Sequence, residues 1–291
     1  MPLTFDVPAV LVVLALGGLY LRATRHRAVR WPPGRTAAFL TGLATILVVT
    51  CSPLAFYDRT FFWVRAVQTV TLLMITPLLL ALGAPIRLLL DVTPARWLRR
   101  HGRGPVARAL TFPPVITLAL VAPVLVLYLT PLYDLTLSSA VVDGLARAVL
   151  VLSGFLYFWT RLGLDPTPRA DPHLVSVWIA FTEVVFDGAL GLVLWLGPLL
   201  APAHYEAAHP GRGPDPRTDQ IVGAGVLWIG GDVAGLPFVI ALFVRWARDD
   251  ERRAKQIDVQ LDEEAAAGAA STSGLWWEND PALADRFKGR G

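Results

Sequence analysis

The amino-acid sequence predicts an all-α integral membrane protein that folds as a bundle of seven transmembrane helices. The 291 residues are 54% hydrophobic and only 17% charged, whereas soluble domains average about 25% charged residues. Seven separate apolar runs have roughly the length that crosses a bilayer. Arginines gather in alternate connections between these runs, which places them on one side of a membrane.

The apolar runs predict helices because long continuous apolar segments must satisfy their backbone groups internally, and no ten-residue alternation typical of a barrel is present. The first run has arginines after it and none before it, the reverse of a secretory signal, and is predicted to be a retained span. The predicted spans are Val7–Leu21, Thr36–Phe56, Phe61–Leu82, Pro113–Leu132, Ala140–Thr160, Leu174–Gly197 and Ile221–Trp246.

The arginine distribution predicts the orientation. Basic residues follow the first, third, fifth and seventh spans, whereas the opposite connections hold only Arg59, Arg212 and Arg217. Because positively charged loops stay in the cytoplasm, the N-terminus is expected outside and the C-terminus in the cytoplasm.

The third span, Phe61–Leu82, contains a charge at Arg65 and an amide at Gln68. A charge inside a bilayer costs several kcal/mol unless it is paired or wetted. Arg65 is therefore expected to have a partner on another helix.

The connections and the tail are predicted from composition. Ile86–Leu110 mixes leucines with six arginines and is expected to lie along the inner membrane face as an interfacial helix. The loop Pro198–Asp219 is expected to be irregular. Residues 1–247 are expected to form the membrane domain and residues 248–291 a polar cytoplasmic tail with a helical run over Glu251–Glu264. The segment Leu275–Phe287 is expected either to dock on a partner protein or to rest on lipid headgroups.

Charged side chains in four spans form one candidate polar cluster. Asp143 and Arg147 are four residues apart, as are Glu183 and Asp187, so each pair shares a helix face. Ionisable groups in a membrane normally face the bundle interior or water. The arginines are expected to meet the carboxylates, and at least one carboxyl group to bind its proton more tightly than usual. The candidate cluster comprises Arg65, Gln68, Asp143, Arg147, Glu183, Asp187, Asp219 and Asp232.

Two interpretations of this cluster remain open. It is either a site open to the outside, for a cation, a proton or a polar partner, or a network of salt bridges that holds the helices together.

Other chemistries have weaker support. The net charge of +3 does not indicate nucleic-acid binding, because the arginines flank apolar runs. Cys51 is the only cysteine, which excludes an internal disulfide. His204, Glu206 and His209 are an alternative outer metal site, although their spacing matches no recurrent helical metal motif. No catalytic fingerprint is present, so the sequence predicts no enzyme.

Several motifs carry a family resemblance. They are Thr76–Pro85 (TPLLLALGAP), Leu129–Asp134 (LTPLYD), Gly154–Trp159 (GFLYFW) and Asp219–Trp228 (DQIVGAGVLW), with a late segment from Trp276 to Phe287 (WWENDPALADRF). In order and spacing they resemble the CtaG family of cytochrome c oxidase assembly factors, and the late segment is similar to the tail of actinobacterial members. The likeness covers most of the chain from the second span to the seventh.

The resemblance implies seven spans in the bacterial inner (plasma) membrane, contact with haem-copper oxidase subunits and a link to copper insertion. The family carries histidine pairs in its third and fifth spans. Here those positions hold Arg65 and Thr69, and Asp143 and Arg147, while a further family histidine falls at Tyr128. A guanidinium group is always protonated and has no lone pair for copper. We therefore expect no metal at these positions and no cofactor; copper follows from the resemblance alone.

These observations predict a membrane assembly factor for cytochrome c oxidase that acts by protein contact and not by catalysis. One alternative is a pathway for a small solute or a proton through the charged cluster. A second is a copper-independent paralogue that scaffolds another envelope complex.

Overall fold

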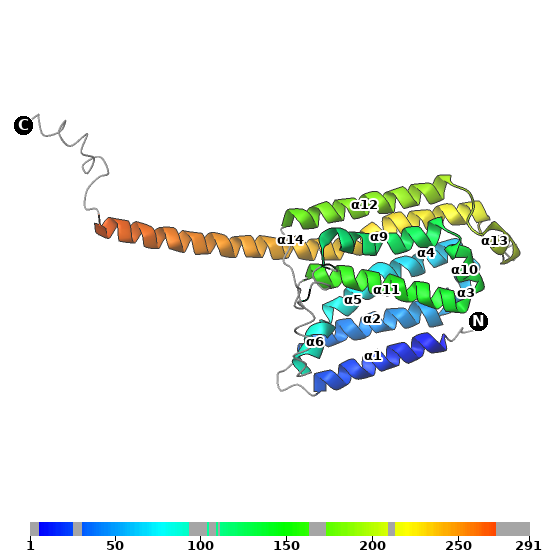
Figure 1. The fold of residues 1–291 in the computed structure, drawn as a ribbon, viewed down its shortest axis with the longest axis horizontal. Coiled ribbons are helices and arrows are strands. Elements are labelled where there is room, and N and C mark those ends of the chain that lie inside the picture. The colour runs from blue at the N-terminus through cyan, green and yellow to red at the C-terminus, as the bar shows by residue number, and fades with distance from the viewer. Residues whose placement is uncertain are drawn as a thin grey trace, which may run out of the picture. The chain divides into compact units, whose positions relative to one another are not determined.

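The computed structural model describes residues 6–25, 31–92, 104, 109, 111–162, 173–208 and 213–271, and within these ranges the regular elements are all helical (Figure 1). Two compact units are present, Met1–Leu236 and Pro237–Gly291. The helices are α1 (Val7–Arg25), α2 (Pro33–Cys51), α3 (Pro53–Tyr57), α4 (Phe62–Val70), the π-helix η1 (Thr71–Ile75), α5 (Thr76–Leu82), α6 (Pro85–Val92), α9 (Pro113–Leu129), α10 (Leu132–Ser138), α11 (Ala140–Leu162), α12 (His173–Leu196), α13 (Pro202–Ala208) and α14 (Pro216–Ser271).

Each predicted apolar run falls on one helix or on consecutive helices. Among the described residues, four helical segments are long and apolar enough to cross a membrane: α1, α2, the continuous segment from α4 to α6, and α11. A fifth is present if α9 and α10, which meet at a bend of 75°, form one span. The chain is therefore an α-helical membrane protein.

The predicted second span is interrupted where the sequence has Ser52 and Pro53. Proline lacks a backbone N–H and disfavours the helical conformation of the residue before it. Ser52 accordingly adopts an extended conformation (φ −97°, ψ 179°), and its hydroxyl accepts a hydrogen bond from the Leu54 backbone N–H at 3.1 Å. The helix ends at Cys51, and the short α3 follows.

Two segments near the C-terminal end of the chain differ from expectation. The loop expected to be irregular contains α13, and the expected helical run Glu251–Glu264 is part of the single helix α14. Of the expected interfacial helix Ile86–Leu110, the structure describes α6 and little more. The segment Leu275–Phe287 lies outside the described residues.

The segment formed by α4, η1 and α5 lies at the centre of the first unit, in contact with α2 and α11 (Figure 1). A π-helical turn inside an α-helix widens the backbone and is frequent at functional sites. Gly154 of α11 allows the close approach here, because a Cβ at this residue would lie 1.9 Å from the Leu73 carbonyl oxygen.

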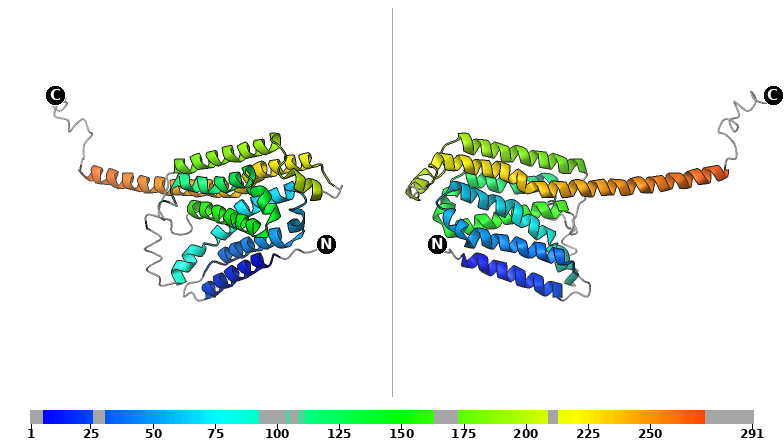
Figure 2. Two further views of the ribbon diagram at one scale, coloured as in Figure 1. Left: turned by 45° about the vertical axis from the view of Figure 1, so that its right-hand side comes forward. Right: turned by 180° about the vertical axis from the view of Figure 1, so that it is seen from behind.

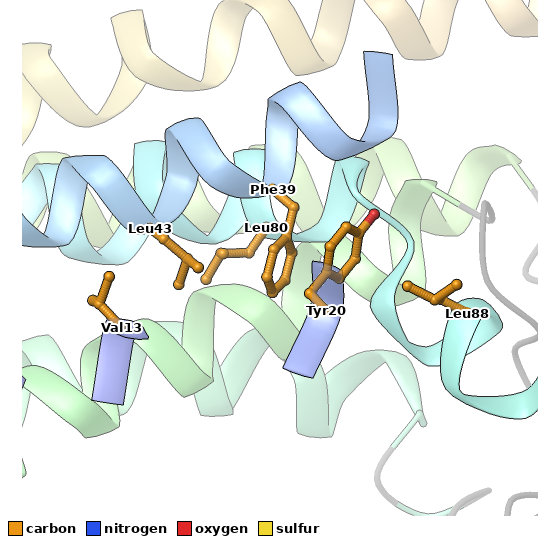
Figure 3. Close-up of a cluster of buried hydrophobic side chains, with 6 residues drawn as sticks. All are labelled: Val13, Tyr20, Phe39, Leu43, Leu80 and Leu88. Atoms are coloured by element: carbon orange, nitrogen blue, oxygen red, sulfur yellow. The ribbon is translucent and has the colours of Figure 1, made fainter. Parts of the chain in front are cut away.

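α1 attaches to this bundle through α2 and α6, and both views in Figure 2 place α1 beside α2. The Tyr20 ring of α1 stacks on Phe39 of α2 with 4.0 Å between ring centroids. The Tyr20 hydroxyl donates a hydrogen bond to the Gly83 carbonyl oxygen at 2.7 Å. The buried cluster in Figure 3 joins these helices through Val13, Tyr20, Phe39, Leu43, Leu80 and Leu88.

Candidate functional site

Arg65 projects from the first turn of α4 and is buried, with 4% of its surface exposed. Its Nη2 donates a hydrogen bond to Asp143 Oδ1 of α11 at 2.7 Å and to Thr136 Oγ1 of α10 at 2.8 Å. The guanidinium group lies 5.5 Å from the centre of the Tyr133 ring, a distance at which the ring attracts a cation. The partner expected for Arg65 is therefore Asp143.

Arg147 lies one helical turn after Asp143 on α11 and binds the other oxygen of the same carboxylate. The distance from Arg147 Nη2 to Asp143 Oδ2 is 2.6 Å. The same nitrogen donates to Asp58 Oδ2 at 3.0 Å, and Nη1 contacts Asp6 Oδ2 at 3.4 Å. We call Asp6, Asp58, Arg65, Asp143 and Arg147 the arginine–aspartate cluster.

Asp58 and Asp6 were not among the predicted site residues. Asp58 lies between α3 and α4 and is completely buried, while its Oδ2 is 3.8 Å from Arg65 Nη1. Asp6 precedes α1, and its Oδ1 accepts a hydrogen bond from the Ala9 backbone N–H at 3.1 Å. Two sequence signals could have identified them. Asp58 is an acidic residue in a short apolar connection, and Asp6 is an aspartate directly before a helix, where N-caps are found.

The remaining polar residues of α4 bind different helices. Gln68 Nε2 donates to the Val49 carbonyl oxygen of α2 at 2.8 Å. Thr69 Oγ1 is hydrogen-bonded to the Arg65 carbonyl oxygen and lies 2.9 Å from the Tyr128 hydroxyl of α9. The positions where the resembled family has histidines thus form two groups. Asp143 binds both Arg65 and Arg147, and Thr69 lies beside Tyr128.

Within the described residues, Arg65 and Arg147 form ion pairs with Asp6, Asp58 and Asp143. Asp187 lines a small cavity, and its Oδ2 would lie 3.3 Å from a Cβ on Gly231. Asp232 is half-buried, and the Glu183 side chain lies outside the described set. The expected arrangement differs because periodicity gives the face of each helix but not which helices are neighbours. The cavity lining is Thr69, Val70, Leu73, Met74, Val124, Asp187, Leu190, Leu227 and Gly231.

Asp219 and Gln220, which open the DQIVGAG motif, connect α14 to its neighbours. The Asp219 carboxylate accepts hydrogen bonds from the backbone N–H groups of Phe62 at 2.7 Å and Trp63 at 3.1 Å, so it caps α4. Gln220 Nε2 donates to the Leu194 carbonyl oxygen of α12 at 2.8 Å. Asp219 therefore stabilises the start of the helix that carries Arg65.

The donor set of the cluster does not suit copper. Two members are guanidinium groups without a lone pair, and both oxygens of Asp143 are occupied by them. Across the described part of the chain, no three His, Cys, Asp or Glu side chains form a metal-binding group. His204 Nε2 lies 2.9 Å from the Arg59 carbonyl oxygen and Glu206 is exposed, while His209 lies outside the described residues.

The ion pairs of the cluster join four segments of the chain. They connect the start of α1, the α3–α4 connection, α4 and α11. Removing one partner from such a pair leaves an uncompensated buried charge, which costs several kcal/mol.

Comparison with protein families gives one match that covers most of the chain. The family model described as cytochrome c oxidase caa3 assembly factor (Caa3_CtaG) matches residues 18–249. The match extends from α1 into α14 and includes all the motifs of the membrane helices.

Curated relatives and solved structures add little about function. Uncharacterised proteins of Mycobacterium bovis and Mycobacterium tuberculosis are each 28% identical to this chain over 267 residues, and one of Mycobacterium leprae is 26% identical over 269 residues. These matches cover 88% of this chain but only 40% or 41% of the relatives. No solved structure matches significantly.

Proposed function

Because the chain belongs to the Caa3_CtaG family of cytochrome c oxidase caa3 assembly factors, we propose that it supports maturation or stability of a haem-copper oxidase by protein contact. Family membership carries the oxidase role. The arginine–aspartate cluster carries the mode of action, because guanidinium groups stand where the resembled family has imidazoles. The protein neither holds copper at these positions nor catalyses a reaction in this proposal.

The proposed setting is the bacterial inner membrane. Seven spans cross it, with the N-terminus outside and the C-terminus in the cytoplasm, and residues 1–247 form the membrane domain. Support comes from the arginines that follow alternate helices. The tail, residues 248–291, ends in the proposed docking segment Leu275–Phe287. The arginine–aspartate cluster then lies toward the external face.

The buried cluster favours contact over transport of a solute. Arg65, Asp58 and Asp143 have at most 4% of their surface exposed, and the guanidinium groups bind the carboxylates directly. These groups are engaged with one another. A transport role would require a solute to break ion pairs that also hold the helices together.

Deletion of the gene in its host tests the function. The proposal predicts less assembled oxidase, seen as a weaker haem a absorbance, and no rescue by copper added to the medium. The wild-type gene should restore the absorbance. A variant with Arg65→Leu and Asp143→Leu should also restore it if its membrane abundance is normal, because the cluster has a structural role. If added copper alone restored the absorbance of the deletion strain, the protein would act in copper delivery. If the deletion left the oxidase level unchanged, the protein would scaffold another envelope complex.

A further inference from the structure

Asp58 is the most deeply buried carboxyl group of the arginine–aspartate cluster. Its exposed fraction is 0%. One oxygen, Oδ2, accepts a hydrogen bond from Arg147 at 3.0 Å, but Oδ1 has no partner among the described residues. A buried carboxylate oxygen without a donor destabilises the ionised form. A proton on Oδ1 would remove this cost.

The charge count of the cluster points to the same group. Within the ion pairs of the cluster, two guanidinium groups face three carboxyl groups, so their full ionisation leaves one excess negative charge. The exposed Arg59 acts on Asp58 from outside these ion pairs. Asp143 has an arginine on each oxygen at 2.7 Å and 2.6 Å. Asp6 is partly exposed, with 28% of its side chain accessible, and caps α1. Asp58 combines complete burial with an oxygen that has no donor among the described residues, which makes it the group that binds a proton.

Electrostatics at Asp58 act in both directions. Burial raises the pKa of Asp58 above its ordinary value, and the nearby Asp143 carboxylate also raises it, while Arg65, Arg147 and Arg59 lower it. The net direction is upward. The groups that face Asp58 are thus Arg65 from α4, Arg147 and Asp143 from α11 and Arg59 from its own connection, with Asp6 beyond Arg147.

Two donors beside Asp58 also lack a hydrogen-bond partner among the described residues. Arg65 Nη1 and Arg147 Nε are buried nitrogen atoms without a hydrogen bond among the described residues. Water accepts from guanidinium N–H groups, and it either donates to a carboxylate oxygen or accepts from a carboxyl O–H. Buried water typically binds polar groups of this kind. The Arg147 side chain is 16% accessible, so the surface of the protein reaches the cluster at this residue.

We propose that Asp58 is a proton-binding site in which the folded protein retains a proton that the unfolded chain loses, and that water held by Arg65 Nη1 and Arg147 Nε exchanges this proton with solvent. Protonation leaves two positive and two negative charges in the cluster. Ionisation transfers the proton from Oδ1 to water and leaves the third carboxylate. This inference concerns the cluster itself and does not depend on the oxidase role.

Infrared spectroscopy of the purified full chain tests the site. A buried protonated carboxyl group gives a C=O stretching band separate from ionised carboxylates. The band should persist at pH 5.5, well above the ordinary aspartate pKa of about 3.9, and should vanish in Asp58→Asn. It should remain in Glu206→Gln, which changes an exposed carboxylate. Absence of the band from the wild type, or its persistence in Asp58→Asn, overturns the proposal.

Stability against pH is an independent test. Since the pKa of Asp58 is raised on folding, the folded state binds more protons above pH 3.8, and stability falls as pH rises through the folded pKa. The unfolding equilibrium constant of the wild type should therefore rise by up to tenfold per pH unit relative to that of Asp58→Asn. Equal slopes overturn the proposal. If Asp58→Asn does not fold, a wild type without the infrared band still contradicts it.

Discussion

Asp143 is the residue on which the arginine–aspartate cluster depends, because it binds both arginines. Replacing it with asparagine removes the charge that compensates a buried guanidinium group. We expect Asp143→Asn to lower the free energy of unfolding by about 3 kcal/mol. Denaturant unfolding in mild detergent measures the change, with Asp134→Asn as the control because Asp134 is exposed on the neighbouring α10.

A double variant separates the ion pair from general disruption. Replacing Arg65 and Asp143 together with leucines removes both charges of this pair and fills their volume with apolar groups, which is often close to neutral. Arg147 keeps Asp58 and Asp6 as partners. The double variant should be more stable than the sum of its single variants by about 2 kcal/mol. Additive single changes would contradict a direct Arg65–Asp143 interaction.

Sequence patterns predict the local part of this site. The spacing of Asp143 and Arg147 places them on one face, and the buried charge of Arg65 requires a partner. Asp58 and Asp6 were missed because their contacts depend on how connections fold back over helix ends. Asp187 was expected at the arginines but lines a cavity with Thr69 and Met74, because helix order around the bundle is not encoded in periodicity.

At the scale of elements, the packing of α11 on η1 depends on Gly154. A methyl group at this position would collide with backbone, since its Cβ would lie 1.9 Å from the Leu73 carbonyl oxygen. Gly154→Ala should therefore destabilise the protein by about 2 kcal/mol, in the range of overpacked cores. Gly144 is a matched control on the same helix, because a Cβ there meets nothing within 4 Å.

Thermal melting of the two glycine variants checks this packing. Gly144→Ala should be neutral or slightly stabilising, because alanine favours a helix by up to about 1 kcal/mol over glycine. Equal melting temperatures for both variants would mean that α11 and η1 do not approach as closely as the structure places them.

The start of α4 depends on a side chain from α14. Asp219 accepts hydrogen bonds from two backbone N–H groups of α4, so Asp219→Ala should cost about 1–2 kcal/mol. Asp219→Asn keeps an acceptor oxygen and should recover most of that loss. Hydrogen exchange at the Phe62 and Trp63 amides measures the effect; unchanged protection in the alanine variant would contradict the cap.

The predicted elements agree with the structure where apolar length decides them. The range Ala140–Thr160 is nearly that of α11. The boundary at Cys51 was misplaced because apolar composition continues past Ser52 while Pro53 ends the helix. The turn chemistry of a Ser-Pro pair was the stronger signal. The π-helical turn at η1 was not predicted; its Leu73 lies against Gly154 of α11.

At the scale of the whole molecule, family membership and the site chemistry give complementary information. The family match covers residues 18–249 and links the chain to oxidase assembly. The chain spans about 40% of the length of the mycobacterial relatives, and the oxidase role is a proposal for this chain alone. The proposal that this role needs no copper at these positions rests on the guanidinium groups of the cluster.

The measurement that tests the central claim most directly is purification of the tagged protein in mild detergent, with protein and metal analysis of the same sample. We predict that oxidase subunits are recovered with it, that copper stays well below one equivalent after dialysis, and that a chelator leaves the melting temperature unchanged. One equivalent of copper retained through dialysis, and lost in Asp143→Asn, would contradict the account.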